Sequence, residues 1–154
     1  MTVVRNFNTQ KSSLAVQMAR PGGRTVSEAI RAAEAGLESH REEGMRSLAV
    51  TLARLEAACA ARGEGAEAQV YELASAFADA AGFFDTGPLY AAAFSLCETS
   101  DRMMAGGCWR WPPVEVHVRA MRLILAAGCE STEATRILQE GLASIVARLP
   151  RQSG

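Results

Sequence analysis

Two histidines, His40 and His117, are the residues of this chain best suited to chemistry, because a histidine on a helix can accept a phosphoryl group from an aspartyl phosphate. His40 is followed four residues later by Gly44, and a small residue at that spacing lets a receiver domain approach the ring. Phosphotransfer proteins usually follow the pattern H-x-x-K-G, whereas Glu43 occupies the lysine position here and would repel the phosphate. The commoner role for such a histidine is an exposed or half-buried polar residue.

His117 is the better candidate phosphoacceptor, since Arg119 and Arg122 are near enough in sequence to stabilise a phosphate. It is predicted to lie about 60° to one side of the apolar stripe of its helix. Met121, however, stands at the fourth following position, where a small residue belongs. The dipeptide Asp101-Arg102 either orients His117 across the fold or forms an ordinary exposed pair. The alternative for His117 is a satisfied histidine at the boundary of the core.

No other pattern in the sequence indicates catalysis or metal binding. The chain lacks G-x-S-x-G, a Walker-type phosphate loop, H-E-x-x-H and any Ser/His/Asp or Cys/His set with a supporting local sequence. A helical di-metal site needs Glu-x-x-His pairs, but Leu37 precedes His40 by three residues and Val114 precedes His117 by three. The four cysteines form no C-x-x-C, which predicts four free thiols. We therefore expect no enzyme activity, no metal and no cofactor.

Two further segments are candidates for binding a partner. Trp109, Arg110 and Trp111 follow one another on a predicted loop, and tryptophan and arginine are enriched at binding hot spots. Because alternate residues of an extended connection point in opposite directions, we expect one tryptophan to cap the core and the other to be exposed. The second segment is a gap in the apolar stripe of the first helix at His40, Arg41 and Gly44, which indicates either a bend or a contact site.

Hydrophobic periodicity predicts an all-α fold. The capping box Thr25-Val26-Ser27-Glu28 starts a long helix whose apolar stripe continues to Arg62-Gly63. Four shorter helices are predicted, with boundaries set by glycine, by proline and, for the last helix, by Ser131 as the N-cap. They cover residues 66–82, 88–105, 112–127 and 132–149. The expected architecture is a bundle of about five helices, similar to a four-helix bundle, with a long N-terminal helix.

Charge and composition define the expected domain organisation. Residues 1–24 carry four basic residues and no acid, which leaves −5 for the remainder of a chain whose net charge is −1. We predict a flexible basic arm over 1–24 and one helical-bundle domain over 25–150. The acidic body lacks the basic surface of a nucleic-acid-binding domain. The sequence has neither a secretory leader nor a run of roughly 20 apolar residues, so we expect a cytoplasmic protein without membrane insertion.

The chain resembles CheE, a group of small alphaproteobacterial proteins encoded in chemotaxis operons. The resemblance lies in these segments: Lys11-Ser12-Ser13-Leu14-Ala15, Pro21-Gly22-Gly23, Val70-Tyr71-Glu72-Leu73, Ser95-Leu96-Cys97 with Asp101-Arg102, Gly107-Cys108-Trp109, and Val114-Glu115-Val116-His117-Val118 with Ala120-Met121-Arg122-Leu123. It covers most of the chain and brings no catalytic residues with it. It implies a cytoplasmic bacterial protein that works with the chemotaxis signalling machinery.

Three functional hypotheses follow. The leading one is a non-enzymatic accessory protein that binds a chemotaxis kinase, receiver or receptor component through a bundle face and the Trp109–Trp111 loop. The second is a divergent histidine phosphotransfer protein with His117, or less favourably His40, as the acceptor. The third is a dimeric scaffold, in which the long helix associates with a second copy through its stripe between Ile30 and Leu55.

Overall fold

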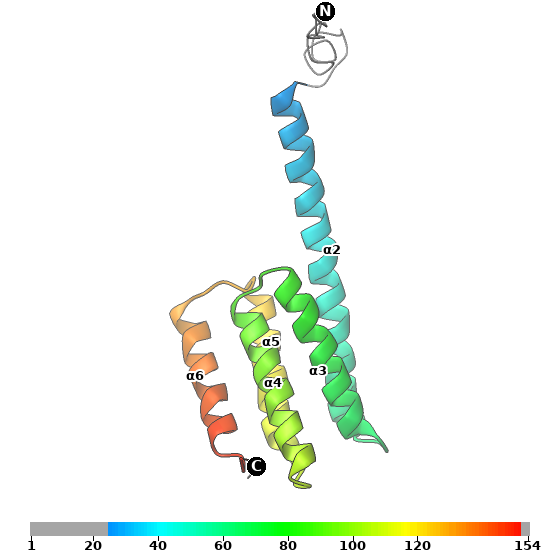
Figure 1. Cartoon of the computed structure of the whole chain (residues 1–154), viewed down its shortest axis with the longest axis vertical. Helices are drawn as coiled ribbons and strands as arrows, with labels where there is room; N and C mark the ends of the chain where they lie inside the picture. Colours follow the sequence, from blue (N-terminus) through cyan, green and yellow to red (C-terminus); the bar gives the residue numbers. More distant parts are fainter. Residues whose placement is uncertain (1–24, 152–154) are drawn as a thin grey trace, which may run out of the picture. The chain divides into compact units, whose positions relative to one another are not determined.

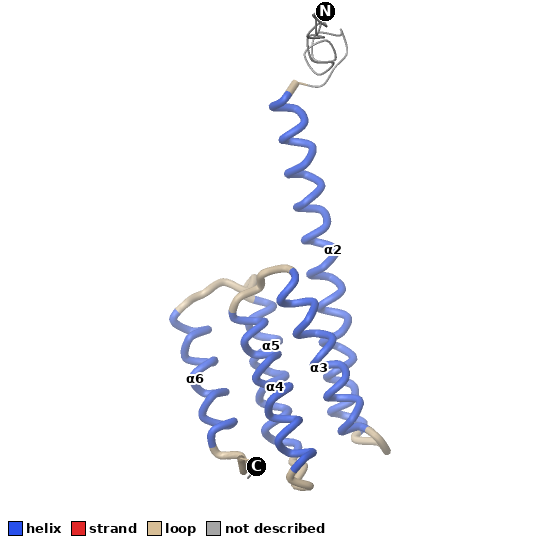
Figure 2. The backbone as a smooth tube through the Cα atoms, viewed as in Figure 1, coloured by secondary structure: helices blue, strands red, loops and turns tan. Residues whose placement is uncertain are grey.

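The computed structural model describes residues 25–151, which form five helices and no strand (Figures 1 and 2). The helices are α2 (Val26–Ala61), α3 (Ala66–Phe83), α4 (Pro88–Ala105), α5 (Trp111–Ala126) and α6 (Glu133–Ala147). This confirms the predicted all-α fold with its long N-terminal helix. The predicted arm over 1–24 lies outside the described residues. No helix of residues 25–151 is long and apolar enough to cross a membrane.

The chain divides into two compact units, residues 1–40 and residues 41–154, and α2 passes from one to the other. In the first unit, every described residue, 25–40, is exposed. Its helix begins with the predicted capping box: the Thr25 amide donates to Glu28 Oε2 at 2.8 Å, and the Glu28 amide donates to Thr25 Oγ1 at 3.2 Å. These two bonds satisfy amides that the first turn leaves without helical partners.

The second unit contains the hydrophobic core. Figure 1 shows α3, α4, α5 and α6 running in alternating directions, as their short connections require. Helix α4 is the central element, because it packs against α3, α5 and α6. The part of α2 that belongs to this unit adds three fully buried leucines. The largest fully buried side chains are Leu48, Leu52, Leu55, Val70, Phe77, Leu89, Leu96, Met103, Val114, His117, Met121 and Ile124.

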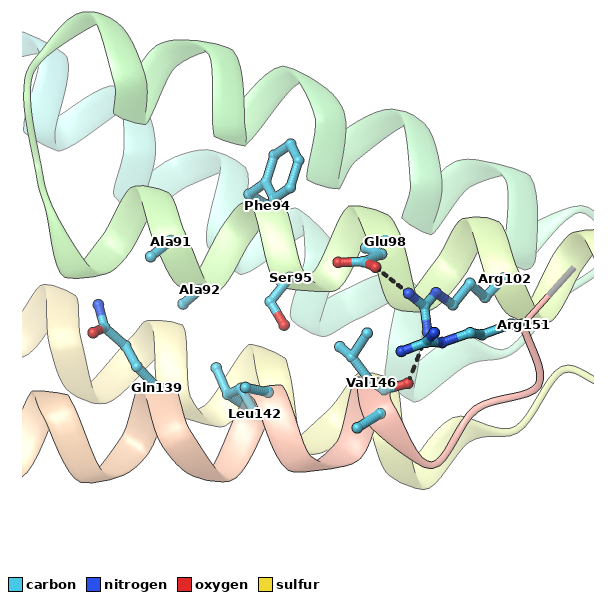
Figure 3. A pocket seen from close by; sticks show the side chains of 12 residues that line it. Ala91, Ala92, Phe94, Ser95, Glu98, Arg102, Gln139, Leu142, Val146 and Arg151 are labelled. Carbon is cyan, nitrogen blue, oxygen red and sulfur yellow. Dashed lines mark hydrogen bonds and ion pairs between the residues drawn. The ribbon is translucent and has the colours of Figure 1, made fainter.

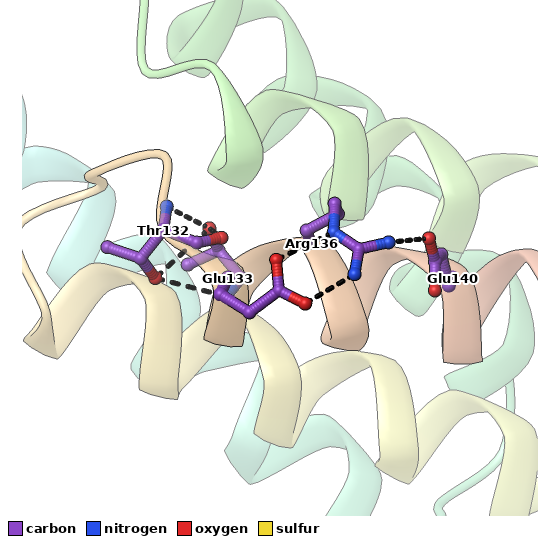
Figure 4. A network of polar contacts seen from close by, with 5 residues as sticks. Thr132, Glu133, Arg136 and Glu140 are labelled. Carbon is purple, nitrogen blue, oxygen red and sulfur yellow. Dashed lines mark hydrogen bonds and ion pairs between the residues drawn. The ribbon is translucent and has the colours of Figure 1, made fainter.

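The start of α6 differs by one residue from the prediction. Its N-cap is Thr132 rather than Ser131, so the Ser131 prediction is wrong. The Thr135 amide donates to Thr132 Oγ1 at 3.2 Å, and the Thr132 amide donates to Thr135 Oγ1 at 2.8 Å. A threonine three residues after the cap thus takes the place usually held by Glu or Gln. Figure 4 shows this capping box continuing into ion pairs of Arg136 with Glu133 and Glu140.

Candidate functional site

His117 is completely buried between α4 and α5, with 0% of its surface exposed. Its Nδ1 lies 2.7 Å from the backbone oxygen of Pro113, one turn earlier in α5. Its Nε2 lies 2.9 Å from Ser95 Oγ and 3.4 Å from Thr99 Oγ1, both on α4. The three contacts satisfy both ring nitrogens and join the two helices.

These contacts define the protonation state of the ring. Because a carbonyl oxygen can only accept, Nδ1 carries the proton, and Nε2 of the neutral ring accepts from a hydroxyl. Burial lowers the pKa of His117 below its usual value, and the hydrogen bond to Pro113 opposes part of that shift. The ring is therefore neutral at pH 7, with Ser95 as its nearest hydroxyl donor.

The pairing of Ser95 with His117 is one that sequence patterns did not reveal, and it resembles a nucleophile beside a base. Ser95 lines a cavity of about 410 Å³ between α4 and α6 (Figure 3). Acyl transfer would also need donors for an oxyanion, but Ser95 lies inside α4, where the neighbouring amides are bonded within the helix. The geometry therefore favours a structural role, in which the serine satisfies a buried imidazole.

The dipeptide Asp101-Arg102 does not orient His117. Arg102 instead pairs with Glu98 on its own helix and donates from Nη1 to the backbone oxygen of Val146 at 3.1 Å (Figure 3). This contact ties α4 to the end of α6. Asp101 is exposed. The alternative of orienting His117 is thus wrong, because Ser95 and Thr99, which lie nearer the start of α4, make the contacts with the histidine ring.

Arg122 and Arg119, which were predicted to stabilise a phosphate on His117, pair with another residue or are exposed. Arg122 makes a bidentate pair with Glu56 of α2, with distances of 2.9 and 2.6 Å, and that contact lowers the pKa of the Glu56 carboxyl. Arg119 is exposed on α5. His40 is exposed in the first unit. Of the two histidines, only His40 is therefore accessible to a receiver domain.

Gly44 and Arg41 contact the connection between α3 and α4. Gly44 is buried, and the ring of Phe84 lies where a side chain at position 44 would be, so that an added Cβ would overlap its Cζ, Cε1 and Cε2 atoms. Arg41 Nη1 donates to the backbone oxygen of Phe84 at 2.7 Å. The gap in the apolar stripe thus accommodates an aromatic ring of the same chain, and both candidate residues make internal contacts.

The two tryptophans pack against each other rather than pointing apart. The rings of Trp109 and Trp111 meet edge to face at 5.5 Å, and both side chains are half-buried against the core. The expectation that one of them is exposed is wrong, because Trp111 already begins α5 and the connection is not extended throughout. The guanidinium of Arg62 lies 5.3 Å from the Trp111 ring and also pairs with Glu115. Between the tryptophans, Arg110 remains exposed.

Arg110 lies at one end of an apolar groove between α5 and α6. The groove consists of two adjoining cavities, of about 380 and 330 Å³, that share Val116 and Ile145. We call it the α5–α6 groove. Its large exposed apolar side chains are Val116, Leu123 and Ile137, which are 44%, 58% and 56% exposed. It is lined by Arg110, Pro112, Pro113, Val116, Arg119, Ala120, Leu123, Ile137, Leu138, Gly141, Leu142, Ile145, Arg148 and Leu149.

The charge on the α5–α6 groove has one sign. Three arginines, Arg110, Arg119 and Arg148, line it, and all three are exposed. Among the described residues that line its two cavities, none is Asp or Glu. Gly141 contributes no side chain to the floor, and a Cβ added there would meet no atom within 4 Å. An apolar floor with basic edges suits an amphipathic segment that carries carboxylates.

The cysteine thiols are separate and free. Cys59, Cys97, Cys108 and Cys129 form no disulfide. Burial raises the pKa of Cys59 and Cys129, and it raises that of Cys97 to about 11. Within the described part of the chain, no three His, Cys, Asp or Glu residues are grouped so that they could hold a metal ion.

Comparison with known proteins gives no match. No family model, curated protein or solved structure matches the chain.

Proposed function

We propose that the protein is a non-enzymatic accessory protein of chemotaxis signalling in the bacterial cytoplasm, and that it binds a kinase, receiver or receptor component through the α5–α6 groove. The observation that carries this proposal is the groove itself, with three exposed apolar side chains, three arginines and no lining carboxylate. The chemotaxis context rests on the resemblance of the motif segments to CheE.

The chemistry of the groove specifies the occupant. Two antiparallel helices leave a furrow that accepts a third helix, whose side chains at helical spacing fill the apolar floor. Carboxylates beside that apolar stripe would meet Arg110, Arg119 and Arg148 at the edges. We therefore infer that the partner presents an amphipathic helix with an acidic flank. Arg110 is the member of the Trp109–Trp111 loop that takes part in binding, while the tryptophans hold the loop on the core.

Filling the groove tests the proposal. Gly141 is exposed and an added Cβ there meets nothing within 4 Å, so Gly141→Trp can direct its ring into the open groove, and circular dichroism checks that the helices are retained. We expect one purified chemotaxis component, the kinase, the receiver or the receptor signalling domain, to bind the wild-type protein in calorimetry. Its affinity for Gly141→Trp should be at least about tenfold weaker, which corresponds to about 1.4 kcal/mol.

Gly141→Ala is the matched control, because it keeps the groove open and should bind as the wild type does. If none of the three components binds the wild-type protein, the chemotaxis proposal fails. If one binds wild type and Gly141→Trp equally well, the groove is not the binding surface.

Phosphotransfer remains the alternative function, with His117 and His40 as acceptors. Because His117 is 0% exposed and both of its nitrogens are bonded, we expect no transfer to it. The chain is mixed with a receiver domain that carries a radiolabelled aspartyl phosphate, and the label on the chain is measured. We expect none. Label on the wild type that His117→Gln or His40→Gln removes would replace the accessory-protein proposal with phosphotransfer at that residue.

A further inference from the structure

The first unit carries an exposed apolar stripe on α2. Val26, Ile30 and Leu37 are 60%, 53% and 71% exposed, although each is a large apolar side chain. At about 100° per residue the three lie within about 40° of one another around the helix. Leu48, Leu52 and Leu55 continue the same helical pattern further along α2, where they are buried in the core. Val26, Ile30 and Leu37 are the exposed part of this pattern, and among the described residues no element covers them.

The flank of this stripe is acidic. Residues 26–40 contain Glu28, Glu34 and Glu38 and one arginine, Arg31, so their net charge is −2 with His40 neutral. Glu34 and Glu38 follow Ile30 by four and eight residues, which places both beside the stripe at about 40° and 80° from it. This segment therefore has the chemistry that the α5–α6 groove requires of its occupant.

The lengths also agree. Val26 and Leu37, at the two ends of the stripe, are eleven residues apart. The lining of the groove on α5 also spans eleven residues, from Pro112 to Leu123, whereas on α6 it runs from Ile137 to Ile145 and continues past the helix end with Arg148 and Leu149. At about 1.5 Å per residue, the stripe and the α5 wall are each about 17 Å long. The apolar stripe is thus as long as the α5 wall of the groove.

We propose that residues 26–40 of α2 dock into the α5–α6 groove of a second copy of the chain. The proposal rests on the groove being a helix-binding site, as argued above. In a symmetric pair each copy would supply one helix and one groove, so that one dimer covers both exposed apolar surfaces. The same contact would exclude any other acidic helix from the groove, and dimerisation would therefore compete with partner binding.

Sedimentation over a range of protein concentrations provides the first test. We expect the wild type to change from monomer to dimer as the concentration rises. Leu37→Asp should weaken the dimer at least about tenfold, because it puts a charge in the apolar contact. Ser39→Asp is the matched control: it adds the same charge two residues later, about 180° from Ile30, and should leave the dimer unchanged. A wild type that stays monomeric at every concentration overturns the proposal.

Mixing two variants separates helix-in-groove docking from pairing of two α2 stripes. Gly141→Trp leaves the apolar stripe of α2 intact but fills the groove. Leu37→Asp leaves the groove open but puts a charge in the apolar stripe. Each alone should dimerise at least about tenfold more weakly than the wild type, and the mixture should form a heterodimer through the one intact contact, more tightly than either variant alone. If Gly141→Trp still dimerises like the wild type, the copies associate through another surface and the proposal is wrong.

Reversal of charge provides an independent test of orientation. Arg119→Glu with Arg148→Glu should weaken the dimer, as should Glu34→Arg with Glu38→Arg, and the four changes together should restore it. All four residues are exposed, so the fold should tolerate each change. If the combined variant dimerises no more tightly than the weaker of the two double variants, the proposed docking is wrong.

A monomeric wild type that still binds a chemotaxis component through the groove would refute self-docking and leave the proposed function standing.

Discussion

Replacement of His117 by alanine should lower the free energy of unfolding by about 2–5 kcal/mol, measured by urea denaturation followed by circular dichroism. The side chain is fully buried, so its removal leaves a cavity between α4 and α5. It also leaves the hydroxyls of Ser95 and Thr99, which contact Nε2 of the ring in the wild type, without that acceptor. Ser39→Ala changes an exposed position of α2 and should stay within about 0.5 kcal/mol of the wild type. Equal effects of the two substitutions would contradict the structural role of His117.

The same histidine predicts how stability depends on pH. Burial lowers the pKa of His117 in the folded protein below the ordinary value of about 6.5 that the unfolded chain retains. Between those two values the unfolded chain binds more protons, so this contribution to stability is complete above about pH 6.5 and is lost as the pH falls towards the folded pKa. His117→Gln, which does not titrate, should remove this part of the acid slope. An unchanged slope would show that other groups produce it.

Gly44→Ala should lower the free energy of unfolding by about 1–3 kcal/mol, although alanine is the better helix former by about 1 kcal/mol. The cause is the Phe84 ring, which occupies the position that the new methyl group would take. Displacement of the ring also disturbs the corner at which Arg41 donates to the Phe84 backbone. Urea denaturation of the single variant measures the loss.

The matched control for Gly44→Ala is Gly141→Ala in α6, where the added methyl group meets nothing within 4 Å and should stabilise the protein by up to about 1 kcal/mol. A double-mutant cycle identifies the cause. In a Phe84→Ala background the ring is gone, so Gly44→Ala should change from destabilising to stabilising. A loss that persists in that background would exclude the ring as its cause.

The helices were predictable because their signals are local. The apolar period of α2 ended at Arg62-Gly63 in the sequence, and the helix ends at Ala61. Pro88 at the start of α4 and Gly128 after α5 likewise mark boundaries that neighbouring residues determine. Thr132 was missed because a threonine pair made the capping box, whereas the expected pattern ends in Glu or Gln.

The surroundings of His117 were not predictable, because they depend on the packing of helices. Its partners Ser95 and Thr99 are 22 and 18 residues away in sequence. The position beside the apolar stripe suggested the edge of the core, but α5 packs against both α4 and α6, which widens the buried arc to include His117. The α5–α6 groove was missed for a related reason: periodicity identifies apolar faces, but not which part of a face the neighbouring helix leaves uncovered.

The raised thiol pKa values have a practical consequence for chemical labelling. A maleimide reacts with the thiolate, so Cys59, Cys97 and Cys129, all with pKa values raised by burial, should react slowly at neutral pH. After Cys108 is replaced by serine, a cysteine introduced at an exposed position of residues 26–40 should take up a fluorophore selectively. This doubly substituted protein could carry a single dye on α2 without prior unfolding, and energy transfer between two such chains would follow their association in solution.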